Sequence, residues 1–344
     1  VGTLNVRGMK SEISGEAKRK HLAHDMEQYK LQVLAIQETH INEMTVEKIR
    51  SGKKQFDMYL SNNPKEDNKT TERAGVGFVV QEDLKACFTP VSNRICILKV
   101  KVWNRNIVII NAYAPTQPVS KKHPEIREEF YNNLEATIRK VSNRDELIIA
   151  GDFNAKTGSA YKDYPDNMGP YGKGICNSNG AELLDLANRH ELIISNTMFK
   201  HKLAHVTTWE SNLRRTDTDR RNPYRNQIDY ILVQTKHKHK VINSRSYNGT
   251  TTFTDHRLVK MKYLSKPQKD KSHKTNKPIN LEKMKDPLVR AQYKFNVEMK
   301  MMDNEYKHQR EGKQPGTQDT WTEITDINHM AAVEVLGYKT KKQF

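Results

Sequence analysis

The chain places a short polar motif directly after a strongly apolar run, and this junction limits the fold more than any other feature. Residues 147–150 (Leu-Ile-Ile-Ala) are typical of a buried strand, and residues 151–155 (Gly-Asp-Phe-Asn-Ala) follow without a break. Asp152 and Asn154 would then lie at the rim of a sheet, where an acid and an amide can orient water and bind a phosphate oxygen. Asp and Asn are also common in turns and helix caps, so the motif alone leaves a structural role open.

Apolar and polar segments alternate along residues 1–264 in a pattern of mixed strands and helices. Helices are predicted at 18–29, at 126–138, where apolar residues recur every four positions, and at 181–190. Mixed strands with helices between them favour two sheets packed together, with the helices outside. Strands are predicted at 3–6, 33–36, 76–80, 147–150, 192–194, 207–209, 228–233 and 258–263, with a hairpin formed by 95–102 and 107–113.

Further polar motifs stand at the ends of these predicted strands, as Asp152 does. A lone exposed Glu, Asp or Asn is usually a solvated surface residue, and a lone His is usually structural. Several such sites, each beside a strongly apolar strand, make coincidence a poor explanation. The residues concerned are Asn5, Glu38, Tyr113, Asp229, Asp255 and His256.

The charge of the chain favours a polyanionic partner. The formal net charge is +17 and the pI is near 9.5. Residues 265–344 hold 16 Lys and Arg against 11 Asp and Glu, so they contribute +5 and the remainder contributes +12. Because both parts share the excess, nucleic acid is the expected partner, although basic residues also serve general solubility.

Cysteine content and hydropathy indicate a reducing compartment. Cys87, Cys96 and Cys176 have neither metal-ligand nor disulfide spacing. No apolar run approaches the roughly 20 residues of a membrane span, and no signal peptide is recognisable. We therefore expect an intracellular protein, nuclear or cytoplasmic, that is not secreted and has no membrane partner. Because Val1 already lies in strand-like sequence, we expect the chain to be part of a longer one.

Taken together, the motifs resemble one family. The sequence is similar to the endonuclease/exonuclease/phosphatase superfamily, which includes DNase I, exonuclease III and the abasic-site endonucleases. The motifs occur in family order over about residues 1–264, and Thr254 stands where many members carry Ser. The resemblance is carried by residues 4–8, 37–39, 111–115, 151–154, 228–230 and 255–256.

The resemblance implies an α/β fold, a four-layered α/β sandwich in which two mixed β-sheets pack face to face with helices outside, and an active site at one end. It also implies a metal site. Glu38, with Asn5 and Asp255 nearby, would bind Mg²⁺, or alternatively Mn²⁺, since a hard cation prefers oxygen ligands.

The resemblance further implies roles for the remaining motif residues. Asp152 would orient or deprotonate the attacking water, and Asn154 would fix phosphate and water. Asp229 would hold His256 in the tautomer that leaves its other nitrogen to stabilise the phosphate. Tyr113 would offer its phenol to the same phosphate, although many Tyr-x-Pro segments only pack.

Within this superfamily the sequence most resembles the endonuclease domains of non-LTR (LINE-type) retrotransposons. Residues 208–229 enclose five arginines between two predicted strands, and in the resembling nucleases a hairpin here contacts DNA. Arginine can follow phosphates or enter a narrow minor groove, whereas the alternative is a solvated loop. The predicted DNA-binding residues are Arg214, Arg215, Arg220, Arg221, Arg225 and Thr208.

Composition divides the chain into three parts. A segment rich in Lys, Ser, Asn and Pro reads as a basic linker, and apolar residues at helical spacing beyond it predict two helices, the second ended by Gly337. These helices resemble the segment that leads to the reverse transcriptase in such elements, and no polymerase motif follows. The endonuclease/exonuclease/phosphatase domain is predicted at residues 1–264, the linker at 265–280 and the helical C-terminal extension at 281–344.

These features predict a Mg²⁺-dependent DNA endonuclease that nicks a phosphodiester and leaves a 3′-hydroxyl. In the family that end primes reverse transcription, so double-stranded DNA, the element RNA and a reverse transcriptase domain are the expected partners. One alternative is an abasic-site repair nuclease or an inositide or sphingolipid phosphodiesterase of the same fold. The other is a catalytically idle DNA-binding remnant. The basic charge argues against the lipid enzymes, and the complete set of motif residues argues against the remnant.

Overall fold

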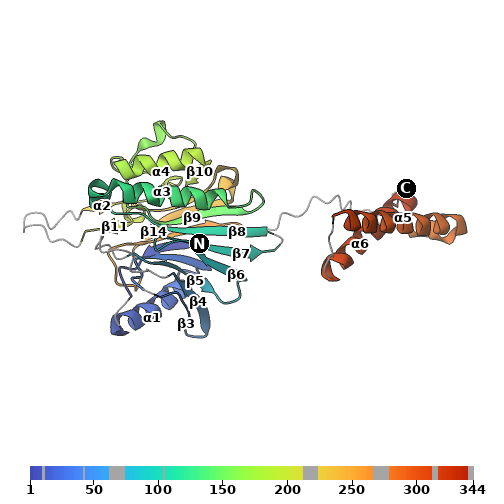
Figure 1. The fold of residues 1–344 in the computed structure, drawn as a ribbon, viewed down its shortest axis with the longest axis horizontal. Helices are drawn as coiled ribbons and strands as arrows, with labels where there is room; N and C mark the ends of the chain where they lie inside the picture. The colour runs from blue at the N-terminus through green and yellow to red at the C-terminus, as the bar shows by residue number, and fades with distance from the viewer. Residues whose placement is uncertain are drawn as a thin grey trace, which may run out of the picture. The chain divides into compact units, whose positions relative to one another are not determined.

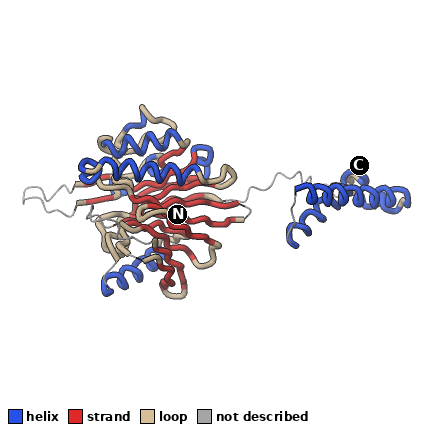
Figure 2. The backbone as a smooth tube through the Cα atoms, viewed as in Figure 1, coloured by secondary structure: helices blue, strands red, loops and turns tan. Residues whose placement is uncertain are grey.

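The computed structural model describes residues 1–9, 12–41, 43–61, 74–103, 105–211, 224–265, 279–311 and 317–339. The chain divides into two compact units, Val1–Pro267 and Gln268–Phe344. The larger unit holds two mixed β-sheets and the helices that cover them (Figures 1 and 2). The smaller unit is helical.

Within the described residues, seven strands form the first sheet and six form the second. In spatial order, the first sheet contains β14 (Val241–Tyr247), β15 (Leu258–Tyr263), β1 (Gly2–Asn5), β2 (Val33–Gln37), β5 (Val76–Gln81), β4 (Lys54–Leu60) and β3 (Thr45–Ser51). The second contains β10 (Leu192–Ile194), β13 (Asp229–Gln234), β9 (Glu146–Asp152), β8 (Arg105–Tyr113), β7 (Ile95–Val102) and β6 (Ala86–Pro90). A separate hairpin pairs β11 (Trp209–Glu210) with β12 (Arg225–Asn226).

The apolar run in β9 is explained by burial on both faces of its sheet. Because successive side chains of a strand point to opposite faces, Ile148 and Ala150 pack between the two sheets. Leu147 and Ile149 point the other way, into the core under the helices. A strand covered on both sides therefore carries only apolar residues and glycine between Glu146 at its start and Asp152 at its end.

Helices form the two outer layers. On the second sheet, α3 (Pro124–Arg139) contributes Phe130, Leu134 and Ile138 to the core, and α4 (Ser178–Arg189) begins where Asn177 accepts a hydrogen bond from Gly180 N–H. The first sheet is covered by α1 (Glu12–Gln28). Figure 1 shows α3 and α4 on one side of the sandwich and α1 on the other.

The remaining helical segments are short. They are α2 (Gln117–Lys122) and the 3₁₀ turns Ala160–Lys162, Ser195–Thr197, Leu203–His205 and Thr235–Lys240.

The predicted four-layered α/β sandwich is confirmed, but four strands of its two sheets, and β12 of the separate hairpin, escaped the sequence pattern. Three of them, β3, β6 and β14, are edge strands, and β4 lies next to an edge. Their sequences mix charged and apolar residues because one face or one side is open to solvent, so no apolar run marks them. The strand predicted at 207–209 begins only at Trp209, and α1 begins six residues earlier than predicted.

The smaller unit consists of α5 (Pro287–Glu311) and α6 (Thr317–Leu336) after a 3₁₀ turn at Leu281–Lys285, which confirms the predicted helical extension. Ile327 and Ala331 are buried, and α6 ends at Gly337, whose positive φ of 66° suits glycine. Phe295 is 61% exposed and Trp321 is 67% exposed. Among the described residues, no helix has both the length and the apolarity needed to cross a membrane.

Candidate active site

The strand register brings the sequence motifs to one edge of the sandwich. In the first sheet β1 and β2 run parallel, with Asn5 opposite Gln37. In the second sheet β8 and β9 run parallel, with Tyr113 opposite Asp152. The antiparallel strand β13 begins at that same edge, with Asp229 opposite Asp152. Both sheets therefore present their polar strand ends on the same side.

Asn5 connects the two sheets through its side-chain amide. Its Nδ2 donates to Glu38 Oε1 at 2.7 Å and to Asp152 Oδ2 at 3.0 Å. The phenol of Tyr113 donates to the same Glu38 oxygen at 2.9 Å. Burial, and then the charges of Glu38 and Asp152, raise the pKa of Tyr113 well above its usual range, so this phenol stays a neutral donor.

Asp229, His256 and Asp152 form a buried chain of ionisable groups. Both carboxylate oxygens of Asp229 lie 3.1 Å from His256 Nδ1, and His256 Nε2 lies 3.8 Å from Asp152 Oδ2. Burial alone would lower the pKa of His256, but Asp229 and Asp152 outweigh it and raise the pKa to about 10. Burial, and then Asp229, raise the pKa of Asp152 to about 7. His256 is thus a cation between two carboxylates, and Asp152 is able to exchange a proton near neutral pH.

The turn after β9 depends on a glycine and a positive φ. A Cβ on Gly151 would lie 1.8 Å from the Ala112 carbonyl oxygen, so only glycine allows β9 to approach β8 this closely. Asn154 follows with φ at 47°, and its Nδ2 donates to the Ala114 carbonyl at 2.9 Å. Its backbone N–H donates to Asp152 Oδ1 at 2.9 Å. The turn thereby holds Asp152 and Asn154 beside one another, as the motif predicted.

Asp255 has two partners to which the sequence motifs gave no role, Arg7 within the motif of residues 4–8 and Trp209 outside all of the motifs. Arg7 Nη1 lies 3.2 Å from Asp255 Oδ2, and Trp209 Nε1 donates to the same oxygen at 3.2 Å. Arg7 lies in the turn after β1, and Lys18 donates to the carbonyls of residues 6, 7 and 8. No sequence pattern indicates these contacts, because the contacts of Asp255 join residues more than 45 positions apart and the partners of Lys18 are backbone carbonyls.

A cavity of about 730 Å³ opens over these groups. Glu38, Asp152, Asn154, Asp255 and His256 all line it. Its basic and aromatic lining comes from Arg7, Lys121, Lys156, Trp209 and Tyr224. The cavity therefore combines carboxylate oxygens, an imidazolium and flanking cations, a set suited to an anionic ester.

Two hydroxyls, one fully buried and one partly buried, connect the segments that carry the site. Thr208 is fully buried, and its hydroxyl accepts from the N–H groups of Ile228 and Asp229 at 2.9 and 3.1 Å. Thr254 donates to the Asn5 carbonyl at 2.8 Å and accepts from His256 N–H. Thr208 was predicted to contact DNA, but its hydroxyl is buried and directed into the protein. Thr208 is therefore not a DNA-contacting residue in this structure.

Most of the predicted DNA-binding arginines lie in the segment between β11 and β12. Arg214, Arg215, Arg220 and Arg221 lie outside the described residues. Arg225 lies in β12, where it forms an ion pair with Glu210 at 3.2 Å.

Fold and site together define a class of enzyme. The protein is a four-layered sandwich, and its two sheets bring acidic, amide and imidazole groups together at one edge. This fold and this site are those of a metal-dependent phosphodiesterase, a hydrolase that acts on ester bonds. The chain belongs to the Endonuclease/Exonuclease/phosphatase family, whose family model matches residues 2–256.

Two curated relatives match part of the chain. Over 269 residues the chain is 27% identical to Craniofacial development protein 2 of Bos taurus and 26% identical to its counterpart in Tragulus javanicus. These matches cover 76% of this chain but only 40% and 42% of the relatives, so the chain spans less than half of their length.

Solved structures share the fold. The endonuclease domain of TRAS1, a telomere-specific non-LTR retrotransposon, has a TM-score of 0.52 at 16% identity, covering 77% of this chain and 98% of that domain. AP endonuclease LMAP from Leishmania major has a TM-score of 0.55 at 15% identity, covering 76% and 86%. The 3′ phosphatase NExo from Neisseria, bound to a product DNA hairpin, has a TM-score of 0.51 at 15% identity, covering 76% and 98%.

Proposed function

We propose that this protein is a Mg²⁺-dependent DNA endonuclease that nicks one strand and leaves a 3′-hydroxyl. The observation that carries the proposal is the buried chain of Asp229, His256 and Asp152 beside Glu38 and Asn5, at the floor of a cavity with a basic rim. The basic charge of the chain supports a nucleic-acid substrate over a lipid headgroup.

The carboxylates of the site fit a hard divalent ion. Glu38 Oε2 and Asp255 Oδ1 are free of the hydrogen bonds from Asn5, Tyr113 and Trp209, which go to the other oxygen of each carboxylate. Such oxygens are what Mg²⁺ prefers. Asn5 directs N–H toward Glu38 and accepts from Arg7 N–H through Oδ1, so it would join the ligands only with its amide turned over.

A second group of side chains could also hold an ion. Asp152, Asp229 and His256 offer ligand atoms within 4.8 Å of one another. Because both oxygens of Asp229 face His256 Nδ1, we assign these three residues to hydrogen bonding and place the ion at Glu38 and Asp255. There a bound ion would neutralise charge that develops on the phosphate and the leaving oxygen.

The residues of the chain supply the rest of the chemistry. Asp152 takes a proton from water, whose oxygen forms a bond to phosphorus as the bond to the 3′-oxygen breaks, and the released 3′-oxygen takes a proton from solvent. His256, held by Asp229, donates from Nε2 to a phosphate oxygen. Asn154 keeps its amide oxygen and one N–H for water and phosphate, since Ala114 uses the other N–H.

We further propose that the protein derives from a non-LTR retrotransposon. The likeness to the TRAS1 endonuclease domain supports this origin. The nicked end would then prime reverse transcription, with element RNA and a reverse transcriptase domain as partners, in the nucleus or the cytoplasm. The helices of residues 281–344 would be the segment that leads to that domain.

A plasmid-nicking assay tests the function directly. With Mg²⁺ the chain should convert supercoiled plasmid to the open circle, and a polymerase should extend the nick without prior end repair. Plasmid that stays supercoiled at high enzyme concentration would refute the proposal. Exclusive cleavage of duplex that contains abasic sites would replace it by a repair activity.

A further inference from the structure

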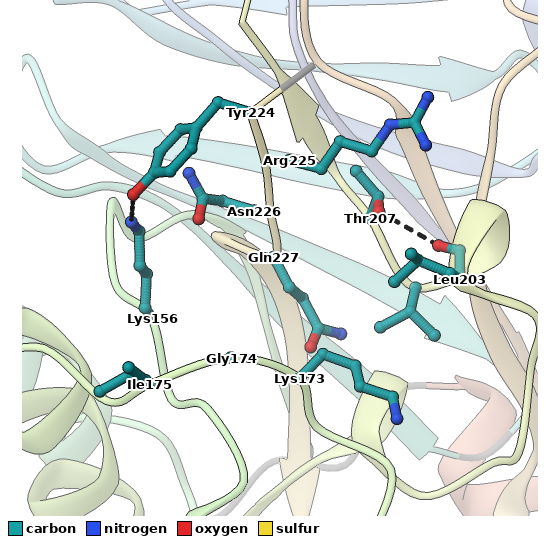
Figure 3. Close-up of a pocket in the computed structure, with 11 residues that line it drawn as sticks. Lys156, Lys173, Gly174, Ile175, Leu203, Thr207, Tyr224, Arg225, Asn226 and Gln227 are labelled. Atoms are coloured by element: carbon teal, nitrogen blue, oxygen red, sulfur yellow. Dashed lines mark hydrogen bonds between the residues drawn. The ribbon is translucent and has the colours of Figure 1, made fainter. Parts of the chain in front are cut away.

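A second cavity adjoins the active-site cavity, and Figure 3 shows its lining. Its volume is about 370 Å³, which is within the range of small-molecule sites. Lys156, Tyr224 and Asn226 line both cavities, so a strand whose scissile phosphate lies at Asp152 can continue into the second one. This second cavity is called the side pocket here, and it is defined by Lys156, Lys173, Ile175, Leu203, Tyr224 and Gln227.

The side pocket contains a buried hydrogen-bond acceptor that lacks a donor. Gln227 is only 5% exposed, and its Nε2 donates weakly to the Asn196 carbonyl at 3.4 Å. Its Oε1 has no hydrogen-bond partner among the described residues. Figure 3 shows the amide end of Gln227 among the residues that line the pocket. Because an unpaired buried acceptor is unfavourable, the pocket favours a ligand that brings an N–H group.

The other walls combine positive charge with apolar surface. Lys156 Nζ donates to the Tyr224 hydroxyl at 3.1 Å and lies 4.9 Å from the centre of that ring. No carboxylate stands among the described residues that line the pocket. Ile175 is 86% exposed and Leu203 is 55% exposed, so both present apolar surface to whatever enters.

These three features together match one chemical class. Lysines suit a phosphate, apolar side chains suit the face of a planar base, and an amide oxygen suits a base N–H. Resting on the nuclease function proposed above, we propose that the side pocket binds one unstacked nucleotide of the cleaved DNA strand, next to the scissile phosphate. Its base donates to Gln227 Oε1, and its phosphate lies beside Lys156 and Lys173.

An abasic scan of the substrate tests the assignment. A duplex with a mapped nick site is prepared with a tetrahydrofuran residue at each nucleotide near the nick, one at a time. The full chain and its Gln227→Leu variant are then compared with Mg²⁺. At one position the missing base should lower kcat/KM of the unmodified protein about three- to tenfold, the size of one hydrogen bond, and should have little further effect on Gln227→Leu. Equal losses in both proteins at every position would overturn the proposal.

A second variant tests the phosphate contact without altering the buried amide. Lys173→Met should lower the slope of log binding affinity against log salt by about 0.9, as expected for one lost phosphate contact. The matched control is Lys200→Met, which removes an exposed lysine outside the pocket. Identical slopes for the two variants would overturn the proposal even if Gln227→Leu failed to fold.

Hydrolysis of bis(p-nitrophenyl) phosphate separates the two proposals. If the unmodified chain with Mg²⁺ neither hydrolyses this ester nor nicks plasmid, the nuclease function is wrong and the side-pocket assignment falls with it. If it does both, and the abasic profile and salt slope are unchanged in the variants, only the side-pocket assignment is wrong.

Discussion

The active-site cavity and the side pocket share a wall but differ in how their polar groups are satisfied. In the active site Asp152 and Asp229 are buried, Asp152 accepts a hydrogen bond from Asn5, and Asp229 directs both oxygens at His256. In the side pocket Gln227 Oε1 lacks a donor among the described residues. The first arrangement holds its buried charged groups in place before substrate arrives, whereas the acceptor of the second gains a donor only from a ligand.

The difference separates chemistry from recognition. Groups held in fixed positions lower the barrier of a reaction because they need no rearrangement in the transition state. A pocket with an unmet hydrogen bond and surface lysines contributes to where the strand lies and how salt affects its binding. We therefore expect substitutions in the active site to change the rate strongly, and substitutions on the side-pocket wall to change binding more modestly.

Loss of the metal site should have the largest effect. Glu38→Ala removes a carboxylate that we assign to Mg²⁺, so nicking should fall to the background seen in excess EDTA. Circular dichroism should show the fold retained. Glu82→Ala removes a half-exposed carboxylate paired with Lys48 and should nick normally. Undiminished relaxation of plasmid in EDTA would contradict the metal assignment.

Substitutions in the buried chain of Asp229, His256 and Asp152 should have the second largest effect on nicking. Asp152→Asn and His256→Ala should each lower the nicking rate at least about a hundredfold, the scale of general acid–base and electrostatic effects. Because both residues act on one transition state, the double variant should lose far less than the product of the two losses. Single-turnover rates measure this, with the exposed Asp166→Asn as control. Multiplicative losses would mean that the residues act separately.

Substitution of Lys156, which lines both cavities, should have a smaller effect on the reaction. Lys156→Met removes the charge that faces both cavities, so duplex binding should weaken and its log–log salt slope should drop by about 0.9. Its effect on the single-turnover rate should be well below that of Asp152→Asn. Fluorescence anisotropy over a salt series gives the slope. Lys162→Met, on an exposed turn, is the control, and equal slopes for both variants would remove Lys156 from the DNA path.

The smallest effect should appear in the pH dependence of stability without metal. His256 has a pKa raised from 6.5 to about 10, so its protonation stabilises the fold fully below pH 6.5, and this contribution is lost as pH rises through about 10. In EDTA, the midpoint of thermal unfolding should therefore fall from pH 7 to pH 10 more in the unmodified protein than in His256→Gln. Exposed His24→Gln should behave like the unmodified protein. Parallel curves for all three would contradict the charged state of His256.

Much of the architecture and of the active site could be predicted from the sequence. Strand β9 carries an apolar run because both of its faces are covered, whereas β15, which was predicted to the residue, alternates apolar residues with lysines. Edge strands such as β3 could not be predicted, because their residues alternate without a clear apolar face and the strand exists through its partner β4. Burial on both faces makes a strand apolar and therefore predictable, whereas strand pairing at the edge of a sheet has little effect on composition.

The sequence by itself determined which polar residues stand at strand ends, since an apolar strand must stop where its buried surface stops. Only the tertiary structure decided their partners. The contacts of Asp255 with Arg7 and Trp209, and the unpaired Oε1 of Gln227, depend on how the two sheets and the β11–β12 hairpin meet. Side-chain contacts across such distances follow from strand register and sheet packing, and these are properties of the whole fold rather than of any local run of residues.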